Sequence, residues 1–275
     1  MTALNKTEFI LSKGNLFRFM KTKKEIVENW LPRYTGMNLN DFGRFILITN
    51  FQNYVERFSQ KFEVPVVGSD KNMPSATANG ISIINFGMGS PNAATIMDLL
   101  GAIKPRGVLF LGKCGGLKRK NKLGDLILPI AAIRKEGTSD DYLPSEVPAL
   151  PAFNLQRAVS HILRNWGKDY WTGVVYTTNR RVWEYDERFK KYLKRTRAMA
   201  IDMETATLFT AGFANQIPTG ALLLVSDQPM ISSGVKTTAS DQKVTSQFID
   251  IHLEAGIKAL LEVKNNGFSV KHLRF

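Results

Sequence analysis

The chain has 275 residues, 44% of them hydrophobic and 22% charged, so it is long enough to bury one large core. Its single cysteine excludes an intrachain disulfide framework, and no apolar run approaches the roughly 18 residues of a membrane span, so we expect a cytoplasmic protein with no membrane partner. The formal net charge of +13 comes from short, scattered basic runs that are typical of solvated helix faces, so a nucleic-acid partner is not favoured and a small anionic substrate is compatible.

The first half of the chain begins with a segment that has no clear period. We expect residues 1–19 to be a loose extension, followed by a single domain over 20–275. From Met20 on, apolar residues recur at helical spacing. The runs FGRFILITNF and GISIINFG then predict strands. The next segment predicts a loop and a helix, with Ser90 as the N-cap and Pro91 at the first helical position.

The second half continues this alternation. GVLFLGKCGGL is typical of a buried strand that runs into a glycine turn, and GDLILPIAAI and ALLLVSD predict two more strands. Apolar spacing predicts helices over 155–166, 187–194 and 244–263. Strands that alternate with helices indicate an α/β fold whose largely parallel sheet is covered on both faces.

Three predicted strands end in unusual residues. These are Gly87-Met88-Gly89, Gly112-Lys113-Cys114-Gly115-Gly116 and Ser226-Asp227. Ligands of open α/β sheets bind outside the carboxyl ends of the strands, where glycines let a ligand approach the backbone. One shared pocket is therefore one interpretation, and three separate turns are the other.

Metal and thiol chemistry are not favoured. The histidines, His161, His252 and His272, lie far apart and lack the spacing of metal ligands, so we expect no metal. Cys114 has no evident histidine base, and a small buried residue at a strand end is its more typical role.

Three motifs carry a family resemblance. GVLFLGKCGG…KLGDLILP, AIDMETATLF and LLLVSD, in this order, resemble the purine nucleoside phosphorylase superfamily, whose members cleave N-glycosidic bonds, over roughly residues 42–261. The resemblance implies a phosphorylase/hydrolase-like three-layer α/β/α fold with a mixed sheet, and self-association into a homohexamer. NFGMGSPNAATIMDLL, YTTNRRVWEYDERF and LLLVSDQPM most resemble the short-form nucleosidases that act on AMP. That likeness implies a purine nucleotide as partner, its hydrolysis to adenine and ribose 5-phosphate, and no cofactor.

The same resemblance implies a ribose site. Glu204 would bind the 2′ and 3′ hydroxyls, with Met203 packed under the sugar and Asp202 helping to hold the loop. A carboxylate suits this role because it accepts from both hydroxyls and stabilises an oxocarbenium-like transition state. Acids that decorate a helix N-terminus are the structural alternative, mainly for Asp202.

The resemblance also implies a proton donor for the leaving base. Asp227, which follows Ser226, would protonate N7 of the purine, with Lys243 as the downstream basic residue that drives the transfer. Asp227 must then be protonated when it acts, and burial is the means of raising its pKa. A cap on the next turn is the alternative role.

Departures from the superfamily favour hydrolysis. FILITNFQNY lacks the Gly-Asp-Pro segment that serves the attacking phosphate, and the arginine and serine of the hexameric phosphorylases are replaced by Phe110 and Lys113. Water is therefore the expected nucleophile, and Lys113 remains a cation for the 5′-phosphate or for inhibitory orthophosphate. The alternatives are a phosphorylase that uses Lys113 and a non-catalytic nucleotide- or nucleic-acid-binding protein.

The segment TTNRRVWEYD is the expected 5′-phosphate site. Trp183 or Tyr185 is a candidate to stack on adenine, although a core position is the commoner role of such aromatic residues. Surface exposure is likewise the commoner role of paired arginines. The candidate phosphate ligands are Thr177, Thr178, Arg180 and Arg181, with Arg33 and Arg44 as possible donors from a neighbouring subunit.

Overall fold

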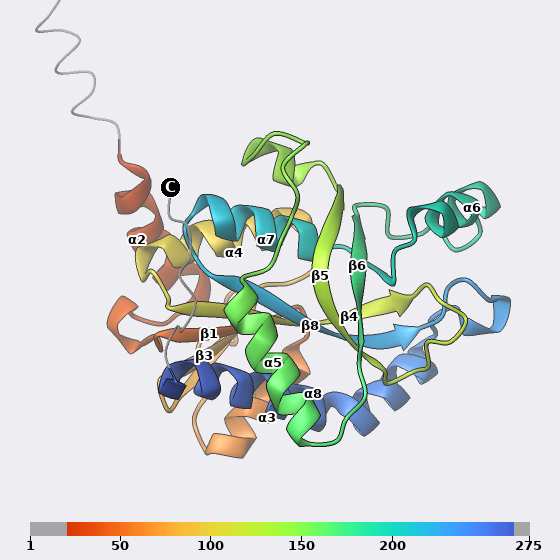
Figure 1. Cartoon of the computed structure of the whole chain (residues 1–275). Helices are drawn as coiled ribbons and strands as arrows, with labels where there is room; N and C mark the ends of the chain where they lie inside the picture. The colour runs from red at the N-terminus through yellow and green to blue at the C-terminus, as the bar shows by residue number, and fades with distance from the viewer. Residues whose placement is uncertain (1–20, 267–275) are drawn as a thin grey trace, which may run out of the picture.

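The computed structural model describes residues 21–266 and contains an eight-stranded mixed sheet between two groups of helices (Figure 1). The predicted extension over 1–19 lies outside the described residues. The strands are β1 (Phe45–Thr49), β2 (Ser75–Ala78), β3 (Ile81–Asn85), β4 (Gly107–Gly116), β5 (Leu126–Lys135), β6 (Trp171–Thr178), β7 (Ala200–Asp202) and β8 (Thr219–Asp227).

The strand order is β2-β3-β1-β4-β7-β6-β5-β8, and β8 also pairs with β4. Strands β4, β7, β6, β5 and β8 therefore close into a ring, while β1, β3 and β2 extend from β4 as an open sheet. Pairing is antiparallel at β2–β3, β4–β7 and β5–β8 and parallel at the other five pairs. The predicted α/β fold with a largely parallel mixed sheet is confirmed, and the closure of the ring is an addition to it.

Helices cover both faces of this sheet, as Figure 1 shows. Along β4, Val108 and Phe110 pack on the side of α2 (Lys23–Thr35), α4 (Ser90–Leu99) and α7 (Thr205–Ala214). Leu109 and Leu111 point the other way, toward α3 (Gln52–Phe62), α5 (Phe153–Asn165) and α8 (Thr238–Asn266). This alternation follows from the two-residue period of a strand. The remaining elements are α6 (Glu187–Thr196), η1 (Leu39–Asp41), η2 (Leu100–Ala102), η3 (Thr138–Asp141) and η4 (Ser232–Gly234).

Helix α4 begins differently from the prediction. Its N-cap is Gly89, with φ of 94°, and Ser90 is already helical, so the assignment of Ser90 as the cap was wrong. A positive φ of this size favours glycine over serine. The Ser90 hydroxyl instead donates to the Met203 carbonyl at 2.6 Å and ties the start of α4 to the segment before α7.

A register shift shapes the end of β8. Cys114 of β4 pairs with Val225, but the next residue, Gly115, pairs with Asp227. Ser226 is thus an extra residue on β8, as in a β-bulge, and bulges re-aim neighbouring side chains. The irregularity lies where the sequence predicted a ligand-facing strand end.

Gly112 has a packing role on β4. A Cβ there would lie 2.2 Å from Cζ of Phe110, whose ring is fully buried on the same face of the strand. Glycine at this position therefore makes room for the Phe110 ring.

We predict that Gly112→Ala destabilises the protein by about 1–3 kcal/mol, the usual cost of overpacking a core. The measurement is urea unfolding of wild type and variant. Gly101→Ala is the control, because a Cβ there has nothing within 4 Å. A Gly112→Ala protein as stable as the Gly101→Ala protein would contradict this packing role.

Candidate active site

The carboxylate of Glu204 lies between two segments that are distant in sequence. Glu204 lies two residues after the end of β7 and is the N-cap residue of α7. Its Oε1 accepts from the Gly89 amide at 2.7 Å, and its Oε2 accepts from the Met203 amide at 3.2 Å. The strand end at 87–89 and the Met-Glu motif, both predicted as site segments, are therefore in contact.

Burial changes the acidity of Glu204. The residue is 2% exposed, and desolvation together with the charge of Asp202 raises its pKa to about 8, against the opposing effect of the two amide donors. A carboxyl group of this kind changes charge near neutral pH, so a bound ligand can shift its protonation state.

Asp202 accepts hydrogen bonds from two threonines on either side of the Met-Glu segment. Its Oδ1 accepts from the Thr177 hydroxyl at 2.7 Å, and its Oδ2 accepts from both the amide (2.9 Å) and the hydroxyl of Thr205. Burial raises the pKa of Asp202 to about 6, although these donors oppose the shift. Asp202 thus connects β6 to the start of α7, and the Thr177 hydroxyl is engaged in this connection.

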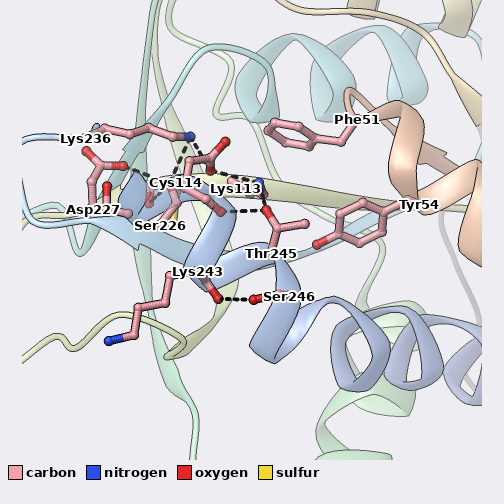
Figure 2. A network of polar contacts seen from close by, with 12 residues as sticks. Phe51, Tyr54, Lys113, Cys114, Ser226, Asp227, Lys236, Lys243, Thr245 and Ser246 are labelled. Atoms are coloured by element: carbon pink, nitrogen blue, oxygen red, sulfur yellow. Dashed lines mark hydrogen bonds and ion pairs between the residues drawn. The ribbon is translucent and has the colours of Figure 1, made fainter. Parts of the chain in front are cut away.

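Asp227 ends β8 in a nearly closed environment. It is 9% exposed, and the Ser226 hydroxyl donates to its Oδ1 at 2.8 Å (Figure 2). Burial raises the pKa of Asp227, and the charges of Lys236 and Arg181 act in the opposite direction. The pKa of this carboxyl group is therefore shifted in the direction that favours a general acid.

The sequence analysis missed a lysine whose charge acts on this acid. Lys236 Nζ lies 3.4 Å from Ser226 Oγ, whereas Lys243 is exposed and extends away from Asp227 in Figure 2. Lys236 lies in an irregular segment before α8 that has no periodic pattern. Its nine-residue separation from Asp227 gave no signal in the sequence.

Lys113 points toward α8. Its Nζ lies 2.8 Å from Asp241 Oδ1 and 2.6 Å from Thr245 Oγ1, and 4.2 Å from the centroid of the Phe51 ring. Burial lowers the pKa of Lys113, while the carboxylate of Asp241 opposes this. The charge of this predicted anion ligand is therefore already paired within the protein.

The two adjacent arginines have different surroundings. Arg180 forms an ion pair with Asp186 at 2.7 Å, whereas the charge of Arg181 acts on Asp227 and lowers its pKa. Arg181 also pairs with Glu184 at 3.3 Å and is half exposed.

The other predicted contacts in this segment are mostly structural. Trp183 is 4% exposed and packs 5.4 Å from the Phe189 ring, so the structure places it in a small core and does not present it to a base. Tyr185 is 74% exposed, and its ring centroid lies 5.6 Å from the guanidinium carbon of Arg180. Thr178 Oγ1 accepts from the Arg180 amide at 3.1 Å.

The loop at 87–89 leaves one apolar side chain open. The Gly87 amide donates to Asn85 Oδ1 at 3.0 Å, and Gly87 has a φ of 81°. Met88, beside the Gly89 contact to Glu204, is 58% exposed. It is therefore available to pack against a ligand.

Among residues 21–266, no group of three or more His, Cys, Asp or Glu side chains is placed to hold a metal ion. Burial raises the pKa of the Cys114 thiol, so the thiolate is disfavoured. His252 is buried between Tyr54 and the Leu222 carbonyl, and burial lowers its pKa to about 4. None of the helices in this range is long and apolar enough to cross a membrane.

Residues 44–261 match the family model of the phosphorylase superfamily. The chain belongs to this superfamily. An AMP nucleosidase of Bacteroides thetaiotaomicron has a solved structure that is 59% identical, with a TM-score of 0.80, over 90% of this chain and 100% of that one. The AMP nucleosidase of Escherichia coli K12 is 30% identical over 84% of this chain, which spans only 57% of that relative. The purine nucleoside phosphorylase of Toxoplasma gondii, solved with immucillin-H, is 20% identical with a TM-score of 0.73 over 83% and 95% of the two chains, and shows the shared superfamily fold.

We predict that Glu204→Gln changes how stability depends on pH. The pKa of Glu204 is raised from 4.5 to about 8 on folding, so its stabilising contribution is fully present below pH 4.5 and is lost as the pH rises toward 8. The wild type should therefore lose stability relative to Glu204→Gln across this interval. Urea unfolding of both proteins between pH 5 and about 8 measures the difference, and a difference that is constant with pH would contradict the raised pKa.

Proposed function

We propose that this protein hydrolyses the N-glycosidic bond of AMP to give adenine and ribose 5-phosphate. The observation that carries the proposal is a pair of buried acids with raised pKa values: Asp227 is the last residue of β8, and Glu204 lies two residues beyond the end of β7. Two such acids suit a reaction that needs a proton donor on one side of the scissile bond and a negative charge on the other. The 59% identity to an AMP nucleosidase supports AMP as the substrate.

Glu204 would hold the ribose. Its two oxygens are oriented by the amides of Gly89 and Met203, and the remaining lone pairs can accept from the 2′ and 3′ hydroxyls. As positive charge develops at C1′, the ionised carboxylate is favoured and stabilises the transition state. The exposed side chain of Met88 and the Met203 segment would pack around the sugar.

Asp227 would protonate N7 of adenine. Burial favours its protonated form, and the Ser226 hydroxyl orients the carboxyl group. Proton transfer as the C1′–N9 bond breaks makes adenine leave as a neutral base. The charge of Lys236, close to Ser226, would then favour the carboxylate that remains after the transfer.

Water is the proposed nucleophile. Lys113, the cation at the position where the phosphorylases have a serine, is paired with Asp241 and buried. An attacking orthophosphate would thus lack the free cation that could orient it. Within our proposal, this favours hydrolysis over phosphorolysis.

Arg181 is the preferred ligand for the 5′-phosphate within this chain, because its charge acts on Asp227 and its ion pair with Glu184 (3.3 Å) is longer than the pair of Arg180 with Asp186 (2.7 Å). Arg33 and Arg44 are both exposed and remain candidates from a neighbouring subunit. We propose that the protein works in the cytoplasm as a homohexamer, the assembly implied by its family resemblance.

We predict that Asp227→Asn lowers kcat by roughly 100-fold or more, the usual scale of general acid catalysis, with little change in AMP binding. The asparagine keeps the shape but cannot donate the proton. Turnover and AMP binding are measured separately, and Asp140→Asn serves as the control because Asp140 is a surface partner of Arg134. A turnover near that of the wild type would remove Asp227 from the mechanism.

We predict that AMP is cleaved far faster than adenosine and that Arg181→Ala narrows this preference more than Arg180→Ala does. Binding energy from the 5′-phosphate would position the ribose for attack by water. Analysis of the products from AMP and adenosine, with and without orthophosphate, provides the measurement. An absolute requirement for orthophosphate, with ribose 1-phosphate accumulating from adenosine, would establish the phosphorylase alternative instead.

A further inference from the structure

Two lysines share a single carboxylate beside the candidate active site. Lys113 Nζ lies 2.8 Å from Asp241 Oδ1, and Lys236 Nζ lies 3.0 Å from the same oxygen (Figure 2). The cations come from β4 and from the segment before α8, and the anion comes from the first turn of α8. Two positive charges thus face one negative charge.

Other groups hold the lysines in place without the help of Asp241. The Lys113 side chain is 3% exposed, donates to Thr245 Oγ1 at 2.6 Å and lies over the Phe51 ring at 4.2 Å. Lys236 lies 5.8 Å from the centroid of the same ring and 3.4 Å from Ser226 Oγ. Removing the carboxylate would therefore leave two positioned ammonium groups without their shared anion.

A cavity of about 530 Å³ opens beside this cluster, between the starts of α3 and α8. Lys113 and Asp241 line it, and so does Asn53, whose Oδ1 is buried and has no hydrogen-bond partner. The Asp241 side chain is 31% exposed. A small ion from solvent can thus reach the position that the Asp241 carboxylate occupies.

We infer that Asp241 is a built-in counter-ion that closes an oxyanion site between Lys113 and Lys236 and so keeps orthophosphate out of it. The carboxylate is attached to the same chain, so it competes with a free ion at a high effective concentration. Lys236 also contacts Ser226 beside Asp227, which places the closed site next to the candidate acid. The inference deepens the proposed hydrolysis and rests on it for its functional meaning: Asp241 determines that orthophosphate does not take the place of water.

The charge state of Asp241 fits this role. Burial alone would raise the pKa of Asp241, but hydrogen bonds and charges from Lys113 and Lys236 outweigh it and lower the pKa. The carboxylate therefore stays ionised at neutral pH, where it neutralises the lysines.

The test is calorimetric titration of sodium phosphate into wild type and Asp241→Asn at pH 7 and constant ionic strength. We expect the variant to bind orthophosphate at least about tenfold more tightly, because the ion replaces the lost negative charge. Glu262→Gln is the matched control, since it removes one charge from the same helix at a residue that pairs with His161 instead. The double variant Asp241→Asn, Lys113→Met should lose the gain.

Equal phosphate affinity in Asp241→Asn and Glu262→Gln would overturn the inference, as would a gain that survives the loss of Lys113. AMP is titrated in parallel: an equal gain in AMP affinity would assign the two lysines to the 5′-phosphate and would also contradict the inference.

Asp241→Ser provides a second variant, in which a shorter side chain replaces the carboxylate. For a weakly folded variant, the rise in Tm with phosphate replaces calorimetry, because ligand that binds the folded state stabilises it; no rise beyond that of the wild type would count against the inference.

AMP cleavage by the wild type is measured separately. Its absence would contradict the proposed function, whereas tighter phosphate binding by Asp241→Asn would still establish the closed site. A failure of the proposed function can therefore be distinguished from a failure of the inference about Asp241.

Discussion

The hydrogen bond from the Gly89 amide to Glu204 joins parts of the chain that are 115 residues apart, and the candidate site depends on it. It fixes the loop before α4 against the start of α7, and the bond from Ser90 to the Met203 carbonyl reinforces the same contact. A buried carboxylate is costly unless it is hydrogen-bonded, so the backbone donors are needed for Glu204 to remain in this position. Glycine at 89 serves twice, since it also adopts the positive φ that starts α4.

The three buried acids near the site, Asp202, Glu204 and Asp227, differ in the hydrogen-bond donors and charges that surround them. Asp202 is surrounded by hydroxyl and amide donors and connects two elements of the scaffold. Glu204 accepts from two backbone amides and is close to the charge of Asp202, so its pKa is higher. Asp227 has one hydroxyl donor and distant cations. Their environments therefore separate a structural acid from two acids that are suited to chemistry.

The lysines and arginines near the site also differ in their partners. Lys113 is paired with Asp241, and Arg180 is paired with Asp186, so neither charge is free for a substrate without a rearrangement. Lys236 and Arg181 both act on Asp227. Lys236 and Arg181 also have acidic partners, Asp241 and Glu184, but their charges still act on the acid that would lose its proton during catalysis.

The sequence by itself determined the α/β class and five of the eight strands of the sheet, because apolar runs and their periods record burial directly. It also pointed to Glu204 and Asp227 as candidates, because the motifs around them are local. It missed α3, β2, β6 and β7, and it selected Lys243 where the structure brings Lys236 to Ser226. Only the tertiary structure decided the ring closure through the β4–β8 pairing, the burial of Trp183 and the pairing of Lys113 with Asp241, 128 residues away. The physical reason is that a charge or a ring takes its role from its neighbours in space, and those neighbours come from elements whose spacing along the chain carries no period.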